Sequence, residues 1–199
     1  MSYVFHYPDL AEALYHALKE DAFYIAMENS ADGDGKEAML RYMDFSMKEA
    51  AEYGRLYIPQ SHRCGVSIWS KPLSAEREAE RSSLKKSFIM EHMGKGSLDT
   101  YKTIVEFMSA RAEEAVTDEY WYLSILGVLP EYQGQGLGVG LVESVLKEAD
   151  EAGVPTYLET FTPRNMSFYK RLGYAESASF TEPLTSTEYF IMTRPPVSY

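Results

Sequence analysis

The sequence predicts an α/β (α+β) fold in which helices flank a mixed central β-sheet. Apolar residues recur at helical spacing in several segments, and short aromatic and aliphatic runs lie between turn residues. In the C-terminal half the two kinds of segment alternate, which is typical of one sheet covered by helices. Since the chain has 199 residues, of which 45% are hydrophobic, we expect a single domain over residues 1–199.

The first half of the chain is expected to start with helices and continue into a strand hairpin. In the first helix Leu10, Leu14 and Leu18 share an apolar face, and Asp9 lies in the first turn, where the helix dipole favours a carboxylate. Residues 61–63 are expected in a short connection of four or five residues between the strands. The expected elements are helices at 8–22 and 36–54 and strands at 55–60 and 64–70.

Residues 74–116 are expected to form a helical insertion. Their charges follow helical spacing, and a Gly-Lys-Gly segment at 94–96 separates two helices. The elements expected after it are a strand at 120–128, a helix at 137–152, a strand at 156–161, a short helix ending at Gly173, and one or two strands from residue 175 onward.

Charge and composition exclude several classes of partner. The net charge of −11 argues against nucleic acid, because phosphate binding needs a basic face. An acidic chain is compatible with a cationic small substrate, and equally with a surface that only favours solubility. The most apolar stretch, 120–129, is too short to span a bilayer, so we expect no membrane partner.

The cysteine and histidine content argues against a disulfide framework and a metal site. Cys64 is the single cysteine of the sequence and is expected to be a buried strand residue rather than a nucleophile. With no signal peptide at the N-terminus, this indicates a cytoplasmic protein. The four histidines have no mutual metal-ligand spacing, so they are expected to be ordinary residues and no metal is predicted: His6, His16, His62 and His92.

A glycine-rich segment precedes the predicted helix at 137–152. Gly134, Gly136, Gly138 and Gly140 alternate with other residues, and glycine lets backbone approach a ligand closely or adopt positive φ. Exposed N–H groups at a helix start bind phosphate, so the segment is a candidate phosphate cradle. The glycine spacing does not fit a dinucleotide fingerprint, and a P-loop is excluded because no lysine occurs between 131 and 146.

Two motifs resemble the signature of the GNAT superfamily, the acyl-CoA-dependent N-acyltransferases. Gln133-Gly134-Gln135-Gly136-Leu137-Gly138 is similar to the family's Gln/Arg-x-x-Gly-x-Gly/Ala pattern, and it follows an apolar strand. Asn165, Tyr169 and Gly173 fall on the positions of a second family motif, with Tyr174 in place of the usual Phe. The resemblance is strongest over 120–175 and implies a GNAT-like sheet, while the insertion at 74–116 departs from the family's minimal pattern.

The resemblance implies a binding site for acetyl-CoA as co-substrate. Its pyrophosphate would bind N–H groups of 134–139, and its pantetheine arm would lie beside the strand at 124–128. In the family this strand separates from its neighbour near a bulge, for which Gly127 is a suitable residue. The coenzyme-binding candidates are Leu126, Val128, Gln133, Gly134, Gln135, Gly136, Leu137, Gly138, Val139, Asn165 and Tyr169. Asn165 has a second interpretation, as the N-cap of the short helix after it.

Three residues are candidates for the chemistry of amine attack on a thioester. By its family position Tyr169 would donate a hydrogen bond to the departing sulfur, whereas a packing role is the alternative. Glu159, which shares a strand face with Tyr157, is the candidate base, although it would need a relayed water or a raised pKa. Its alternative role is to orient a cationic substrate. Ser124 could hold a relay water, and the N–H of Leu126 or Val128 could stabilise the oxyanion.

The predicted function is therefore acetyl transfer from acetyl-CoA to the primary amine of a small molecule by direct attack. A non-catalytic acyl-CoA-binding or sensing domain and a protein N-acetyltransferase are the alternatives, and a homodimer is left open. The insertion at 74–116 is expected to cover the acceptor side of the site. Tyr24, Trp69 and Phe88 are candidates for lining an acceptor pocket, with core packing as the alternative for each.

Overall fold

The structure, a computed structural model, describes residues 3–60 and 63–197. The prediction that His62 is an ordinary surface residue therefore lies outside the described residues, as does part of the expected turn at 61–63. The described α-helices are α1 Pro8–Leu18, α2 Ala22–Asn29, α3 Gly35–Tyr53, α4 Ala75–His92, α5 Lys95–Ala115, α6 Glu143–Glu151 and α7 Met166–Arg171. The described strands are β1 Gly54–Tyr57, β2 Gly65–Ser70, β3 Trp121–Val128, β4 Thr156–Thr160, β5 Ala175–Glu182 and β6 Thr187–Arg194.

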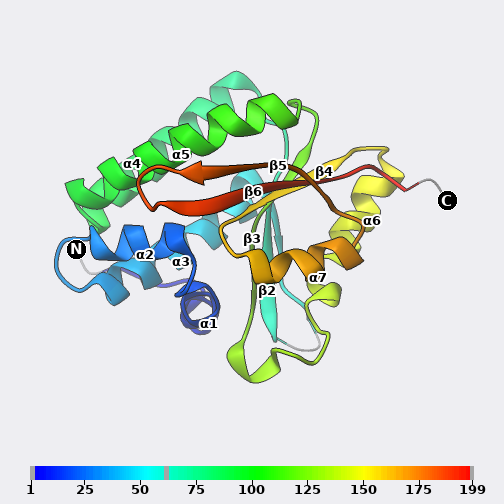
Figure 1. Cartoon of the computed structure of the whole chain (residues 1–199). Coiled ribbons are helices and arrows are strands. Elements are labelled where there is room, and N and C mark those ends of the chain that lie inside the picture. Colours follow the sequence, from blue (N-terminus) through cyan, green and yellow to red (C-terminus); the bar gives the residue numbers. More distant parts are fainter. Residues whose placement is uncertain (1–2, 61–62, 198–199) are drawn as a thin grey trace.

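The strands form one mixed sheet in the order β1-β2-β3-β4-β6-β5. The β3–β4 pair is parallel, and the other neighbours are antiparallel. This confirms the α/β (α+β) fold with a mixed central sheet (Figure 1). Residues 175–196 supply two strands, β5 and β6, rather than one.

Helices cover both faces of the sheet, because successive strand residues point to opposite sides. Leu158 and Met192 are buried against α6 and α7, whereas Tyr189 and Ile191 are buried against α5. The helices α1, α3 and α4 share a further core with Val66 and Ile68 of β2. Figure 1 shows α4 and α5 side by side along one side of the sheet, with α6 and α7 on the other.

The predicted insertion at 74–116 is present as α4 and α5, which confirms two helices in that segment. The turn between them contains Gly94, whose φ of 91° requires glycine. Ser74 caps α4 by accepting a hydrogen bond from the Arg77 N–H.

The first predicted helix is wrong in its extent. Residues 8–22 divide into α1 and the start of α2, because Asp21 has an extended backbone and its side chain accepts a hydrogen bond from the Phe23 N–H, which caps a new helix. The α2 helix was not expected from the sequence. The strand hairpin is present, but its connection spans residues 58–64 and is longer than expected.

The predicted helix at 137–152 is also shorter than expected. A 3₁₀ turn at Val139–Leu141 precedes α6, which begins only at Glu143. Leu141, Val145 and Ala149 are fully buried as predicted, whereas Leu137 is only partly buried and lies outside the helix. The glycine-rich segment is therefore a loop that leads into a 3₁₀ turn, and not the first turn of an α-helix.

Candidate active site

The parallel strands β3 and β4 pair over only part of their length. Trp121–Leu123 pair with Thr156–Leu158, whereas β3 continues to Val128 and β4 to Thr160. Beyond this point β3 pairs only with β2, and β4 pairs only with β6. The two strands thus separate at their carboxyl ends, which leaves backbone N–H groups of β3 without a strand partner on that side.

A β-bulge at Ser124 lies where the separation begins. Ile68 of β2 faces Ile125, and Trp69 faces Leu123, so Ser124 is the additional residue of β3. The expectation of a bulge at Gly127 is wrong, because Gly127 pairs regularly with Val66. Gly127 has another role: a Cβ atom there would lie 2.3 Å from Leu14 Cδ2, so the glycine permits the close approach of α1.

The bulge changes which residues of β3 direct their N–H groups toward β4. Before it, the Trp121 N–H donates to the Pro155 carbonyl on the β4 side. After it, the Leu129 N–H donates to the Cys64 carbonyl on the β2 side. Successive strand residues alternate in this direction, so Leu126 and Val128 direct their N–H groups toward the gap. Leu126 and Val128 are the two alternative oxyanion donors predicted from the sequence.

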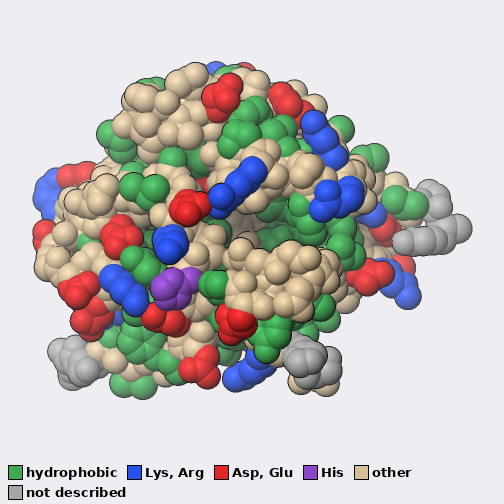
Figure 2. Space-filling model, turned by 60° about the horizontal axis from the view of Figure 1, so that its bottom comes forward, with side chains coloured by type: hydrophobic (Ala, Val, Ile, Leu, Met, Phe, Trp, Pro, Cys, Tyr) green, Lys and Arg blue, Asp and Glu red, His purple; other side chains and the backbone are tan. Residues whose placement is uncertain are grey.

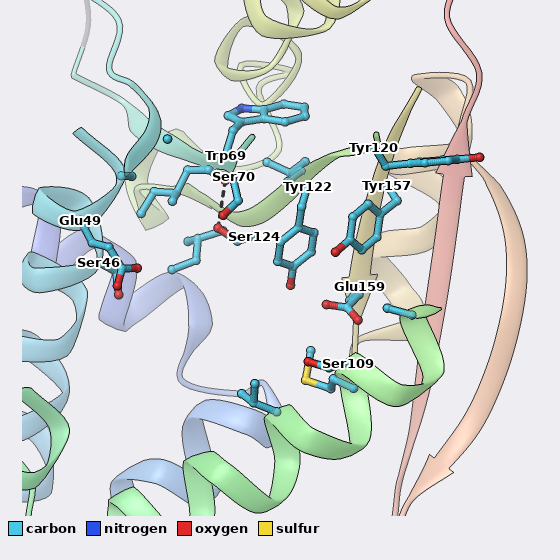
Figure 3. A pocket seen from close by; sticks show the side chains of 18 of the residues that line it. Ser46, Glu49, Trp69, Ser70, Ser109, Tyr120, Tyr122, Ser124, Tyr157 and Glu159 are labelled. Atoms are coloured by element: carbon cyan, nitrogen blue, oxygen red, sulfur yellow. Dashed lines mark hydrogen bonds between the residues drawn. The ribbon is translucent and has the colours of Figure 1, made fainter. Parts of the chain in front are cut away.

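A cavity of about 750 Å³ opens at this gap. Its walls come from α3, α4, α5, β3 and β4, and Figure 3 shows the polar side chains that point into it. Five of the predicted site residues line it together: Ser124, Leu126, Glu159, Asn165 and Tyr169. Val128 and the segment from Gln133 to Val139 do not line this cavity. Residues of α4 and α5, which form the segment predicted as an insertion, also line the cavity.

Glu159 lies in the cavity wall within a group of tyrosines. The Tyr189 hydroxyl donates a hydrogen bond to Glu159 Oε1, and Tyr122 also hydrogen-bonds to this carboxylate. Burial raises the pKa of Glu159, and the hydrogen bonds from the two tyrosines oppose that rise. Tyr157 shares the strand face of Glu159 and stacks on Tyr122, with ring centroids 4.6 Å apart. A raised pKa is the property that a carboxylate base would need here.

Tyr169 lies in α7 and is 9% exposed. Burial raises its pKa, and nearby Tyr174 and Asp21 add to the rise. Its hydroxyl therefore stays protonated at neutral pH, which suits a hydrogen-bond donor and does not favour full proton transfer. The Tyr169 ring also packs at a T-shaped angle against Phe168 and Tyr174, so the side chain contributes to core packing whatever its hydroxyl does.

Two other predicted residues have definite contacts. The Ser124 hydroxyl donates to the Ile68 carbonyl across the bulge at 3.1 Å, so its proton is already engaged, although its oxygen can still accept. Asn165 occupies the N-cap position of α7, as one interpretation expected, but its side chain makes no cap hydrogen bond there. Its exposed side chain lines the cavity instead.

The glycine loop, residues 133–139, adopts positive φ at two of its glycines. It does not line the cavity. Gly134 and Gly136 have φ angles of 74° and 76°, and a Cβ atom at either would meet nothing within 4 Å. The loop is held by two glutamine side chains: Gln133 donates to the Val128 carbonyl, and Gln135 donates to the Glu131 carbonyl. The positive φ angles and the open space at these exposed glycines leave room for a diphosphate group such as that of coenzyme A.

Several lining residues were not identified from the sequence. Tyr122 lies two residues before Ser124 in the same strand, so strand alternation offered a weak signal for it. Glu49 also lines the cavity, but it is far from the motifs in sequence, and no spacing connected it to the site. The same holds for Tyr189, which contacts Glu159 but does not itself line the cavity. Of the aromatic candidates, Tyr24 and Trp69 line the cavity. Phe88 does not, because it stacks on Phe45 in the core beneath α4.

The surface carries no continuous basic patch on the face shown in Figure 2, where acidic and basic side chains are interspersed around a hollow with apolar side chains. Within residues 3–60 and 63–197, no group of three or more His, Cys, Asp or Glu side chains could hold a metal ion. None of the helices in that part of the chain is long and apolar enough to cross a membrane.

Comparison with known proteins gives a family and a fold. Residues 60–174 match the model of the acetyltransferase (GNAT) family. A curated N-acetyltransferase of Schizosaccharomyces pombe, itself uncharacterized, is 33% identical over 81 residues. This match covers 40% of the chain, and the chain spans only about a third of that relative's length.

Solved structures resemble nearly the whole chain. A histone acetyltransferase HPA2 and related acetyltransferase from Corynebacterium glutamicum has a TM-score of 0.65 at 17% identity, covering 97% of this chain and 92% of its own. Arylalkylamine N-acetyltransferase 2 from Aedes aegypti has a TM-score of 0.63 at 14% identity, covering 96% and 95%. At such low identity these likenesses establish the fold alone. Because the family model matches more than half of the sequence, the chain belongs to the GNAT family of acetyltransferases, transferases that act with acyl-CoA.

Proposed function

We propose that the protein transfers the acetyl group of acetyl-CoA to the primary amine of a small molecule by direct attack. The observation that carries the proposal is the position of Glu159 and Tyr169 in the wall of one cavity, at the gap between β3 and β4. Acyl transfer from a thioester to an amine needs both a base for the amine proton and a donor for the departing sulfur. Membership of an acetyltransferase family supports the reaction class.

The backbone and side chains have separate roles in this proposal. The glycine loop around Gly134 and Gly136 would hold the diphosphate, and the N–H group of either Leu126 or Val128 would stabilise the developing oxyanion. When bound, acetyl-CoA supplies an activated thioester carbonyl. Glu159 would accept the proton of the amine, directly or through a water that Ser124 helps to hold. Tyr169 would donate a hydrogen bond to the sulfur.

Direct attack is favoured over transfer through a covalent enzyme intermediate. Cys64, the single cysteine of the sequence, is buried and does not line the cavity. A small acceptor is favoured over a protein because α4 and α5 contribute to the cavity wall, which restricts the space beside Glu159. The single cysteine also supports a reducing, cytoplasmic location.

The test is turnover by the purified protein. Acetyl-CoA and a panel of primary amines would be incubated with the enzyme, and release of free thiol would be followed. We expect thiol release that depends on the amine and is lost in Glu159→Gln. Tight binding of coenzyme A in calorimetry without turnover of any amine would instead favour a non-catalytic acyl-CoA-binding protein.

A further inference from the structure

The cavity has a second buried carboxylate, on the wall that faces Glu159. Figure 3 shows Glu49 and Ser46 of α3 on one side of the cavity and Glu159 of β4 on the other. The Glu49 side chain is only 12% exposed. It lies on the opposite side of the cavity from Glu159, the proposed base. The two carboxylates come from segments about a hundred residues apart, and only the folded chain places them on one cavity.

One oxygen of Glu49 is buried without a partner. Lys85 Nζ lies 3.3 Å from Oε2, and Arg81 lies 3.7 Å from the same oxygen. Oε1 has no hydrogen-bond partner among the residues that the structure describes. A buried carboxylate oxygen without a donor is costly. Because Oε1 also has almost no solvent-accessible surface, the cost is relieved only if the Glu49 carboxylate turns toward the cavity and meets a donor on a bound molecule.

The two cations beside Glu49 are themselves engaged. Arg81 donates two hydrogen bonds to Glu78, and the Lys85 ammonium donates to the Ser46 hydroxyl at 3.0 Å. Burial lowers the pKa of Lys85, and the neighbouring Glu49 carboxylate opposes that change. The carboxylate therefore keeps the capacity to bind a further cation.

The charge of the whole cavity also favours cations. Three basic side chains line it: Lys71, Arg81 and Lys85. Six carboxylates line it: Asp21, Glu49, Glu78, Glu113, Asp118 and Glu159. Between the carboxylate walls lie tyrosine rings, whose faces attract alkylammonium groups. A volume of about 750 Å³ exceeds what a single short monoamine needs.

We propose that the acceptor is an aliphatic diamine, whose reacting amine lies at Glu159 while its second ammonium donates to the Glu49 carboxylate. Glu49 is then a specificity-determining residue of the same site. This inference rests on the proposed amine acetylation and goes beyond it by naming the class of acceptor. The chain between the two nitrogen atoms would lie along the tyrosines, which cover its methylene groups.

The test compares diamines with monoamines of equal chain length. The ratio of kcat/KM for putrescine to butylamine, cadaverine to pentylamine and hexamethylenediamine to hexylamine would be measured by thiol release. We expect the best diamine to exceed its monoamine by about tenfold or more, since one buried charge contact is gained. In Glu49→Gln that ratio should fall to within about twofold of unity.

Two further variants make the result specific. Glu52→Gln removes an exposed carboxylate from the same helix, outside the cavity, and should keep the wild-type ratio. Glu49→Asp withdraws the carboxylate by one methylene group, so the preferred diamine should become longer. This variant keeps the charge beside Lys85, and the melting temperature of each variant would show whether it folds.

The outcomes separate this inference from the proposed function. If monoamines are acetylated and diamines have no advantage, or if Glu49→Gln keeps the diamine advantage, the diamine inference is overturned while amine acetylation stands. If no amine of either class releases thiol, the proposed function fails and the inference falls with it.

Discussion

The hydroxyl group of Tyr189 on β6 donates a hydrogen bond to the carboxylate of Glu159 on β4. Ile191 is the residue directly opposite Glu159 in the antiparallel pair, so Tyr189 is its diagonal neighbour on the same face of the sheet. Tyr189 is fully buried, and its position is fixed by pairing with Phe180 of β5. The sheet register thus controls both the position and the protonation of the proposed base.

Removing this hydrogen bond should change the pH dependence of the enzyme. The Tyr189 hydroxyl stabilises the ionised carboxylate, so Tyr189→Phe should raise the pKa of Glu159 further. Because a base acts in its ionised form, the acidic limb of the kcat/KM profile should move to higher pH. The measurement is kcat/KM for one amine across the acidic range.

A matched control distinguishes this effect from a general packing change. Tyr157→Phe removes a hydroxyl from a neighbouring ring that stacks on Tyr122 but has no hydrogen bond to Glu159 among the described contacts. The acidic limb of this variant should stay close to that of the wild type. An unmoved limb in Tyr189→Phe would show that Tyr189 does not position an acting base.

Replacing Glu159 should make the protein more stable and less active. Burial raises the pKa of Glu159 in the folded state, so ionisation of this carboxyl opposes folding. Its contribution to the free energy of unfolding is therefore fully present at low pH and is lost as the pH rises through the pKa of the folded state. Glu159→Gln removes that cost. At about pH 8 the melting temperature of the variant should be roughly 2–4 °C higher for each kcal/mol gained in the free energy of unfolding. Its kcat should fall by about a hundredfold or more.

The stability difference between Glu159→Gln and the wild type should depend on pH. At about pH 4, where Glu159 is protonated in the folded wild type, the difference in melting temperature should shrink toward zero. A variant that is less stable than the wild type at high pH would show that the buried carboxylate contributes to stability instead.

Removing the Tyr169 hydroxyl should affect turnover more than binding. Tyr169→Phe keeps the ring contacts with Phe168 and Tyr174 but removes the proposed donor to the sulfur. We expect kcat to fall by about ten- to a hundredfold, since one hydrogen bond to a developing negative charge is lost. Coenzyme A affinity in calorimetry should change little.

Tyr174→Phe is the control for Tyr169. It also removes a buried tyrosine hydroxyl from the same core, one that accepts a hydrogen bond from Thr156, but Tyr174 does not line the cavity. We expect it to lower stability while kcat stays near the wild-type value. Equal kcat values for Tyr169→Phe and the wild type would exclude a role of Tyr169 in departure of the sulfur.

A side chain in the glycine loop should weaken coenzyme A binding. Gly136 has positive φ, and open space surrounds the position of a Cβ atom. Gly136→Val would place a branched side chain where the diphosphate is expected and would strain the backbone, so affinity for coenzyme A should fall by about tenfold or more. Isothermal titration calorimetry measures this directly.

Backbone strain alone is controlled by Gly153→Val. Gly153 also has positive φ and open surroundings, but it follows α6, away from the loop. The two variants should lose similar stability, while only Gly136→Val should lose affinity. Unchanged affinity in Gly136→Val would contradict the assignment of this loop to coenzyme A.

Local patterns in the sequence were sufficient to predict several helices, the family and some of the candidate site residues. Amphipathic spacing was sufficient to predict α4 and α5, and the glycine and Asn-Tyr-Gly motifs indicated the family that the comparisons confirm. These features depend on residues close together in the chain, where helix periodicity and turn chemistry act. Leu126, Glu159 and Tyr169 were predicted as site residues because they lie in or beside such motifs.

Tertiary structure decided what depends on contacts between distant residues. The bulge lies at Ser124 rather than Gly127, because strand pairing with β2 sets the register, and Gly127 is required by the approach of Leu14. The cap formed by Asp21 divides the first helix, and α6 begins late because the preceding loop forms a 3₁₀ turn. The pairing of Tyr189 with Glu159, and the facing position of Glu49, arise from folding alone, since side chains far apart in sequence share a cavity only after the sheet and helices have packed.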